Sequence, residues 1–314
     1  MALYVLRRLA LAIPLLFIVS ILTFVMVALI PGDPAVRILG AGHTLAQYHA
    51  LDRKLGLTQP ILSQYWHWLD RLLHGSLGSS LFTQQSVGSE ISQRLGVTLS
   101  LVVGSTLLSL IIGVALGIAT AVRQGALGRV IDTLSWVGFA IPNFWLGLIL
   151  IELLAVTAKL LPPSGYVPLG QSVGAWLKSL VLPVLTLSAV GATGVAKQTR
   201  DSLGDVMSSE FISALEIAGL PRRSVVLCHA LRNAALPTVT TVGLFAVAML
   251  GGTILVEQVF ALPGLGSLAV QAASDHDLPV IEGVVLTFTL IVVVVNLVID
   301  LSYAWLNPRV RLAA

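Results

Sequence analysis

The stretch from Val97 to Val122, VTLSLVVGSTLLSLIIGVALGIATAV, contains no charged residue. An α-helix rises about 1.5 Å per residue, so roughly 20 apolar residues cross the hydrocarbon core of a bilayer. A small residue recurs at every fourth position of this stretch: Ser105, Ser109, Gly113, Gly117 and Ala121. Small residues at this spacing let a second helix approach closely. The stretch therefore predicts a membrane-spanning helix that packs against a neighbour through Ser109, Gly113 and Gly117.

Further apolar stretches of similar character lie on both sides of it: Leu9–Ile30, Thr133–Ala158, Ser179–Ala196, Ala234–Val256 and Gly283–Leu306. The chain of 314 residues is 56% hydrophobic and 11% charged, and its mean hydropathy is +0.93. Soluble domains carry about 25% charged residues, so the composition argues against a soluble enzyme or a nucleic-acid-binding protein. It predicts an all-α membrane protein with six transmembrane helices.

Lysine and arginine are unevenly distributed between the segments that join these spans. With a cytosolic N-terminus, the inner segments contain most of them: Arg7, Arg8, Arg123, Arg129, Lys197, Arg200, Arg222, Arg223, Arg232, Arg309 and Arg311. The short outer segments contain only Lys159 and Lys178. Because cytosolic segments carry an excess of Lys and Arg, we predict that both termini are cytosolic.

This topology divides the chain into four parts. Residues 1–30 contain the cytosolic N-terminus and the first span, and residues 31–96 form a long extracytoplasmic segment. Residues 97–306 form a core of five spans, in which residues 197–232 are a cytosolic segment between the fourth and fifth spans. Residues 307–314 form a cytosolic tail.

The extracytoplasmic segment contains helix-like runs at Leu45–Leu55 and Ile61–Leu73. The second run has four large side chains on one helical face: Ile61, Tyr65, Trp68 and Leu72. This spacing predicts an amphipathic helix. With Trp66 beside this face, the helix is expected to lie at the outer membrane surface, where aromatic rings are enriched, or to cap the bundle; the two placements are compatible.

The cytosolic segment 197–232 has the charge content of a soluble protein. Ser208 or Ser209 can cap a helix that begins at Glu210, because serine oxygens accept hydrogen bonds from free amide groups at a helix start. Phe211, Leu215 and Ala218 share one face of this helix. Gly219 predicts a left-handed stop, and a second helix can begin at Pro221. We interpret the segment as a helical hairpin that docks a soluble partner; the alternative is a solvated linker.

Two patterns suggest chemistry at first sight. Residues 170–174 match G-x-S-x-G and raise the alternative of an intramembrane hydrolase built on Ser172, but that motif requires a preceding strand. Asp275, His276 and Asp277 could be imagined as a metal site, although a hydrated loop is the favoured interpretation. We therefore predict no catalytic residue and no metal ligand in this chain.

The chain also lacks any Gly-Lys dipeptide and hence a phosphate-binding Walker loop. If transport is driven by ATP, another polypeptide must hydrolyse it. Glu152, Asn296 and Asp300 are polar groups within predicted spans, where facing lipid is costly. Together with Asn143 they are candidates for a translocation pathway. Structural hydrogen bonding, or an ion-coupled secondary transporter that uses Glu152 and Asp300, are the alternatives.

Several longer motifs together identify a family. They are PGDP at residues 31–34, LGL with QP at residues 55–60, residues 75–80, IPNFWLG at residues 141–147, VFALPGLG at residues 259–266 and NPRVR at residues 307–311. From end to end, the chain resembles the first of the two permease subunits of dipeptide/oligopeptide/nickel-type ABC importers. This resemblance implies the type I ABC importer permease fold.

The cytosolic hairpin resembles the coupling motif of such permeases, which reads EAA, three residues, Gly, nine residues and I-x-L-P. Gly219 matches the glycine, while Ser213-Ala214-Leu215 replaces EAA and Arg232 replaces the final proline. The resemblance implies that the hairpin couples the permease to its ATPase. The residues to which it assigns this coupling are Phe211, Ser213, Ala214, Leu215, Glu216, Gly219, Arg222, Arg223 and His229.

The resemblance also implies the partners and the setting of the protein. These are an extracytoplasmic solute-binding protein, a homologous second permease, two nucleotide-binding domains that hold ATP and Mg²⁺, and the lipid of a bacterial inner membrane. The chain itself would bind no cofactor and no nucleic acid. Its cargo would be a peptide or a similar small solute, a class that includes dipeptides, oligopeptides, nickel chelates, haem and glutathione.

Overall fold

The computed structural model of the protein describes residues 2–29, 34–40, 42–56, 58–122, 130, 133 and 141–306. In these ranges the regular secondary structure is helical, apart from an isolated antiparallel bridge between Ser79 and Ser86. Five of the described helices are long and apolar enough to cross a membrane. The prediction of an all-helical membrane protein is therefore confirmed.

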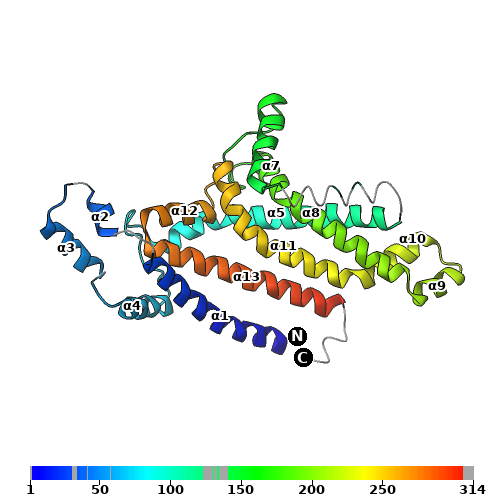
Figure 1. Ribbon diagram of the computed structural model, residues 1–314, viewed down its shortest axis with the longest axis horizontal. Coiled ribbons are helices and arrows are strands. Elements are labelled where there is room, and N and C mark those ends of the chain that lie inside the picture. Colours follow the sequence, from blue (N-terminus) through cyan, green and yellow to red (C-terminus); the bar gives the residue numbers. More distant parts are fainter. Residues whose placement is uncertain are drawn as a thin grey trace. The chain divides into compact units, whose positions relative to one another are not determined.

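The long helices are α1 (Ala2–Ala28), α5 (Val87–Val122), α8 (Val173–Met207), α11 (Leu231–Val259) and α13 (Leu278–Leu306), as Figure 1 shows. The shorter α-helices are α2 (Pro34–Leu39), α3 (Leu45–Leu55), α4 (Ile61–Leu73), α7 (Asn143–Leu150), α9 (Glu210–Ile217), α10 (Arg222–Ser224) and α12 (Leu265–Asp275). Two π-helical segments, η1 (Ile151–Thr157) and η2 (Val225–Ala230), continue α7 and α10.

Several helices extend beyond the spans that hydropathy predicts. α5 begins at Val87 rather than Val97, and α8 covers Val173–Met207 rather than Ser179–Ala196. Hydropathy marks only the part of a helix that lipid would surround. The backbone hydrogen bonds of a helix are internal, so the helix continues into water until a breaker stops it.

The predicted third span, Thr133–Ala158, lies only partly within the described residues. Its described portion forms α7 and η1, an apolar helix shorter than the five long ones. Residues 31–33 and the predicted tail 307–314 lie outside the described residues.

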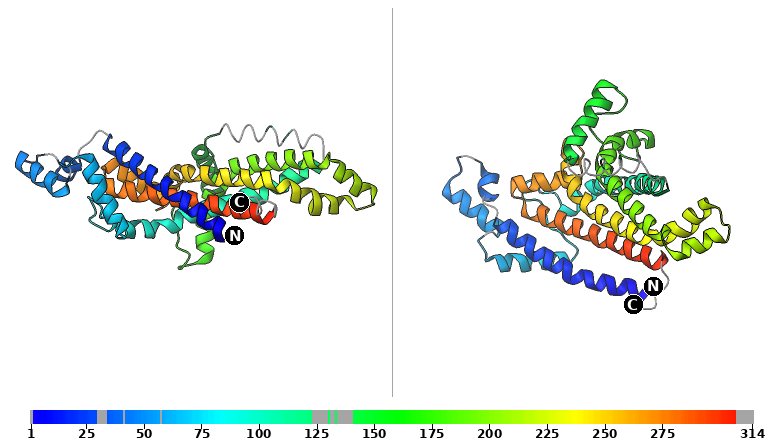
Figure 2. Two further views of the ribbon diagram at one scale, coloured as in Figure 1. Left: turned by 90° about the horizontal axis from the view of Figure 1, so that it is seen from below. Right: turned by 45° about the vertical axis from the view of Figure 1, so that its right-hand side comes forward.

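The described chain forms two compact units. The first unit contains residues 99–262 and 294–306, and the second contains residues 2–98 and 263–293. In the first unit, α8 is the most buried of the long helices and contacts α7, α9 and α11. Its packing along α11 is visible in Figure 1 and again in the turned views of Figure 2.

The small-residue ladder of α5 lies against α8 in this unit. The Ser109 hydroxyl donates a hydrogen bond to the Ser188 carbonyl oxygen at 3.0 Å. A Cβ atom added to Gly113 would lie 2.6 Å from the Cβ of Val195, and one added to Gly117 would lie 2.5 Å from the Cβ of Thr199. The two backbones therefore approach as closely as glycine permits.

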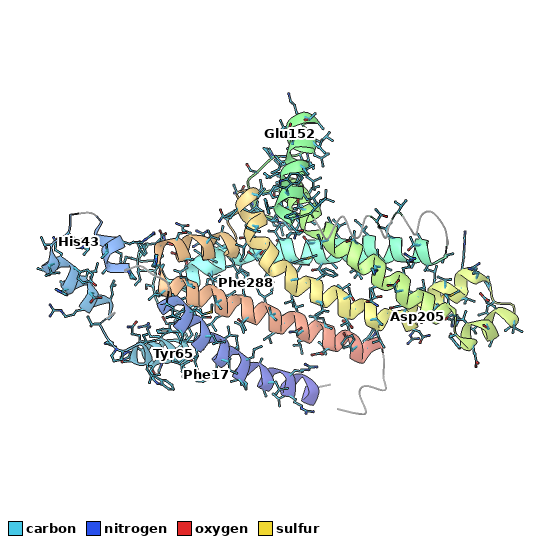
Figure 3. All side chains as sticks on the ribbon, in the orientation of Figure 1. Phe17, His43, Tyr65, Glu152, Asp205 and Phe288 are labelled. Carbon is cyan, nitrogen blue, oxygen red and sulfur yellow. The ribbon has the colours of Figure 1, made fainter. Side chains whose placement is uncertain are left out.

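The second unit joins α1 to the amphipathic helix α4. The Tyr65 hydroxyl lies 3.0 Å from that of Ser20, and the Tyr65 ring packs edge-on against Phe24 with centroids 5.5 Å apart. Figure 3 labels Tyr65 beside Phe17 on α1. Tyr65 and Trp68 are buried, but Ile61 of the predicted apolar face is 51% exposed. α4 thus caps α1 with only part of that face.

Candidate functional site

The segment between α8 and α11 is a helical hairpin, which we call the α9 hairpin (residues 208–230). α9 begins after Ser209, whose backbone has the extended conformation of a cap. The predicted side-chain cap is wrong, because the Ser209 hydroxyl donates to the Val206 carbonyl oxygen at 2.6 Å instead. Glu210 in the first turn still suits the positive end of the helix dipole.

The end of α9 is fixed by a left-handed turn at Gly219. Its φ of +81° is a conformation that costs a side-chain-bearing residue about 1–2 kcal/mol. The Gly219 amide donates to the Glu216 carbonyl oxygen at 3.0 Å, and the Leu220 amide donates to that of Leu215 at 3.3 Å. These two bonds form a Schellman motif, and Leu215 and Leu220 both pack on the same apolar cluster. The predicted stop at Gly219 is confirmed.

The chain then returns directly into α11. Pro221 precedes α10, as predicted, but α10 and η2 are not a separate helix, because residues 222–259 form one continuous apolar helical run. Val225 and Val226 are buried in it. The returning arm of the hairpin is therefore the start of a membrane helix, whereas α9 is a separate helix after the end of α8.

The inner side of the hairpin is a small hydrophobic core. Ile212 is 1% exposed and packs with Leu203 of α8 and with Val225, Val226 and Ala230. A buried isoleucine among such neighbours ties α9 to the ends of α8 and α11 by close packing.

The outer side of α9 is also apolar but exposed. Phe211 is 49% exposed and Ile217 is 88% exposed, and Ala214 and Ala218 lie on the same exposed side. The predicted face of Phe211, Leu215 and Ala218 is thus divided, since Leu215 packs inward while the other two do not. We call Phe211, Ala214, Ile217 and Ala218 the α9 outer face.

The hairpin also exposes polar groups. Glu216, Arg222 and Arg223 are exposed. The His229 ring, half-buried, packs edge-on against Phe211 with ring centroids 6.5 Å apart. Figure 3 labels Asp205 at the end of α8 that leads into the hairpin. The sequence analysis selected Phe211 and Ala214 as coupling residues but missed Ile217. The available signal was a large apolar residue two positions before Gly219, the glycine that ends the helix.

The four pathway candidates lie in two regions of the first unit. The Asn143 side chain lies against Gly252 of α11. Glu152 in η1, labelled in Figure 3, is exposed. It accepts a hydrogen bond from the Thr157 hydroxyl at 3.3 Å. Asn296 on α13 is exposed, whereas Asp300 is buried. The structure does not gather these four side chains into one cluster.

The sequence did not reveal that several carboxyl groups are buried, among them Glu257 and Asp277. Glu257 is fully buried in α11, one residue beyond the predicted span. Asp277 is also buried, so the predicted hydrated loop is wrong: its carboxylate accepts bonds from the Ser80 hydroxyl at 2.5 Å and from the Leu81 amide at 3.2 Å. Burial raises the pKa of Asp277 above its ordinary value of 3.8, while these hydrogen bonds oppose the rise. Asp275 pairs instead with Arg37 at 3.5 Å.

The residues of the two suggestive patterns have structural contacts in the described chain. Ser172 is the N-cap of α8, and its hydroxyl oxygen accepts a hydrogen bond from the Ala175 amide at 3.3 Å. No strand precedes it in the described residues 141–171. Within the part of the chain that the structure describes, no group of three His, Cys, Asp or Glu side chains is placed to hold a metal ion.

Comparison with known proteins identifies the family. The family model of the inner membrane component of binding-protein-dependent transport systems matches residues 109–312. The chain belongs to this family. A second model, for the N-terminal part of such membrane components, matches residues 1–102 of the permease.

Relatives of the permease cover nearly its whole length. A protein of Salmonella typhimurium (strain LT2) named as a glutathione transport system permease is 41% identical over 310 residues, which is 98% of each chain. A protein of Brucella abortus (strain 2308) named as a peptide transport system permease is 37% identical over 308 residues, again 98% of each. A protein of Sinorhizobium fredii named as a peptide ABC transporter permease is 36% identical over 312 residues, 99% of this chain and 100% of the relative.

These matches confirm the resemblance that the sequence motifs indicated. The protein is the multi-pass, non-catalytic permease component of a binding-protein-dependent ABC importer in the inner membrane, and the ATPase resides on separate subunits. Membership of this family replaces the two alternative functions, an intramembrane hydrolase and an ion-coupled secondary transporter.

Proposed function

We propose that this permease forms half of a translocation pathway for peptides and that the α9 hairpin transmits the motion of the ATPase to it. The observation that carries the proposal is the α9 outer face, an exposed apolar surface on a helix whose inner side is firmly packed. Exposed apolar surfaces on the part of a membrane protein that faces water mark interaction sites. A homologous second permease forms the other half of the pathway.

The packing of the hairpin suits it to transmit force. Ile212 joins α9 to both α8 and η2, and η2 continues into α11. A displacement of α9 therefore has to move the ends of two membrane helices, because packed interiors transmit strain. Such a rigid element can switch a helix bundle between two arrangements.

The chemistry of the outer face suits an apolar cleft with polar edges. The contact area would come from Phe211, Ala214, Ile217 and Ala218. The same hairpin exposes Glu216, Arg222 and Arg223, and the His229 ring packs against Phe211. Ser213 is exposed on the same helix. Burying a side chain such as Ile217 contributes about 1.5–3 kcal/mol to association.

The membrane topology that accompanies this proposal has six spans. The five long helices and the helix Asn143–Thr157 supply them, and the distribution of Lys and Arg puts both termini and the α9 hairpin in the cytosol. Residues 31–96 would then lie on the outer side, where a solute-binding protein delivers cargo.

The names of the relatives support a peptide as cargo. Two of them are named for peptides and one for glutathione, which is itself a tripeptide derivative. Asn143, Glu152, Asn296 and Asp300 remain the candidates that line the pathway, since polar groups in spans are costly against lipid.

Co-purification with the ATPase tests the coupling proposal. In Ile217→Asp a charge replaces the most exposed side chain of the α9 outer face, so the yield of ATPase retained on the permease should fall at least tenfold. Ser208→Asp adds the same charge to the hairpin at an exposed site off this face and should retain the ATPase. Equal retention by both variants would contradict the assigned docking surface.

A further inference from the structure

The second unit contains a cavity that neither the coupling site nor the pathway candidates use. Its volume is about 370 Å³, and it lies between α1, the end of α3, α4 and the start of α13. This volume is within the range of sites that bind small ligands. The cavity is therefore large enough to hold a molecule rather than a single water.

Four basic side chains contribute to the lining of the cavity. Arg53, Lys54, His67 and Arg71 line it and are exposed. Neither Arg53 nor Lys54 has an ion-pair partner among the described residues, and the Arg53 Nε–H donates to the His49 carbonyl oxygen at 3.1 Å. The lining thus offers cationic donors with no acid paired to them.

Only one carboxylate lines the cavity within the described chain. Glu282 is 5% exposed and lies close enough to Arg71 to interact electrostatically with it. Even if Glu282 is counted as charged, the three cations Arg53, Lys54 and Arg71 outnumber it and leave the lining positive. Guanidinium and ammonium groups in such a setting favour phosphate oxygens.

Two aromatic side chains, Phe24 and Trp68, also line the cavity, close to the end of the membrane helix α1. Phe24 is buried near the end of the apolar run Leu6–Val27, and Trp68 is 3% exposed. The Trp68 indole Nε1–H is buried without an acceptor among the described residues. The cavity therefore adjoins the end of a helix that is apolar enough to cross a membrane, which is where lipid headgroups would lie.

The helix that forms one wall has the character of an interfacial helix. α4 exposes Leu62 (67%), Trp66 (54%) and Leu73 (78%), although its other face packs on α1. Exposed Leu and Trp on an amphipathic helix insert at the boundary between headgroups and acyl chains. A ligand with a phosphate and attached acyl chains could bind the cationic lining through its phosphate and contact the exposed apolar side chains of α4 through its acyl chains.

We propose that this cavity binds the phosphate group of an anionic phospholipid headgroup. The bound lipid would fasten α4 to the ends of α1 and α13 at the membrane surface. The inference is independent of the ATPase-docking proposal, because it depends only on residues of the second unit, whereas the α9 hairpin belongs to the first.

Native mass spectrometry of the purified importer complex tests the proposal. The complex in detergent is mixed in turn with phosphatidylglycerol, phosphatidylcholine and glycerol 1-phosphate, and the bound fraction is measured. We expect tighter retention of phosphatidylglycerol than of the other two. A juxtamembrane cation contributes about fivefold to binding of an anionic lipid, so Arg53→Gln/Lys54→Gln should lower the retention of phosphatidylglycerol by at least fivefold.

A matched variant serves as the control. Arg37→Gln removes an exposed arginine of the same unit outside the cavity and should retain phosphatidylglycerol like the wild type. Equal retention of phosphatidylglycerol by the wild type and the Arg53/Lys54 variant would contradict the proposed site. Binding of glycerol 1-phosphate as tight as that of phosphatidylglycerol would show that the site binds a free phosphate compound rather than a lipid.

Discussion

Gly113 of α5 and Val195 of α8 lie so close together that neither helix could accept another atom between them. A Cβ on Gly113 would approach the Cβ of Val195 to 2.6 Å and the Ala192 carbonyl oxygen to 2.9 Å. Backbone carbonyl oxygens cannot rotate away as a side chain can, so this contact fixes the distance between α5 and α8.

Gly113→Ala should therefore destabilise the permease despite the higher helix propensity of alanine. Overpacking of this kind costs about 1–3 kcal/mol, which should appear as a lower thermal unfolding midpoint in detergent. The control is Gly96→Ala in the same helix, where an added Cβ meets nothing within 4 Å and alanine should be neutral or stabilising. Equal midpoints for the two variants would show that the helices are not in close contact.

Much of the fold could be predicted because it depends on local properties of the sequence. The length of charge-free runs fixes where helices cross lipid, and Gly219 fixes where α9 ends. The ends of the long helices could not be read from hydropathy, since Lys197 and Arg200 lie well inside α8. A helix does not end merely because its side chains become polar.

The parts that sequence reasoning missed depend on contacts between distant residues. Asp277 is buried because Ser80 meets it from far away in the chain. Phe211 and Ile212 are neighbours on one helix, and only the packing of Leu203 and Val225 decides that Ile212 faces inward. The basic cavity likewise combines residues of several helices, none of which forms a motif by itself.

Gly219→Ala should loosen the end of α9, because alanine is strained at a φ of +81°. The expected cost is about 1 kcal/mol, and it should appear as faster hydrogen exchange of the Gly219 and Leu220 amide positions that close the Schellman motif. Gly204→Ala, in ordinary helical conformation with open space around it, should not change this exchange. Unchanged protection in Gly219→Ala would contradict the left-handed turn.

Asp277→Asn should alter how stability depends on pH. Because burial raises the pKa of Asp277 above 3.8 in the folded protein, the folded state binds the proton more tightly than the unfolded state does. The contribution of Asp277 is therefore fully present below about pH 3.8 and decreases as pH rises through the raised pKa. Thermal midpoints of wild type and Asp277→Asn should agree most closely at acidic pH, and the variant should gain relative stability towards pH 7. A difference that does not vary with pH would count against the buried carboxyl group.

Ser172→Ala separates helix capping from catalysis. Loss of the cap on Ala175 should cost about 0.5–2 kcal/mol of stability, because one amide at the start of α8 loses its acceptor. ATP-dependent uptake in proteoliposomes should continue at a similar rate, since Ser172 forms no bond with cargo in the proposed mechanism. Complete loss of activity in a folded Ser172→Ala permease would revive a chemical role for this serine.

Ile212 and Ile217 lie on opposite sides of α9, so their truncation should affect different properties. Ile212→Ala should lower stability, and Ile217→Ala should lower the affinity for the ATPase. Ile212→Ala removes a side chain that is 1% exposed and should lower the free energy of unfolding by about 2–4 kcal/mol, because a cavity forms beside Leu203 and Val225. Ile217→Ala removes one that is 88% exposed, so unfolding should hardly change while the affinity for the ATPase falls about tenfold or more. Differential scanning fluorimetry and titration with the purified ATPase separate the two effects. If Ile217→Ala were to destabilise the isolated permease and leave ATPase binding intact, the outer face would be part of the fold rather than a docking surface.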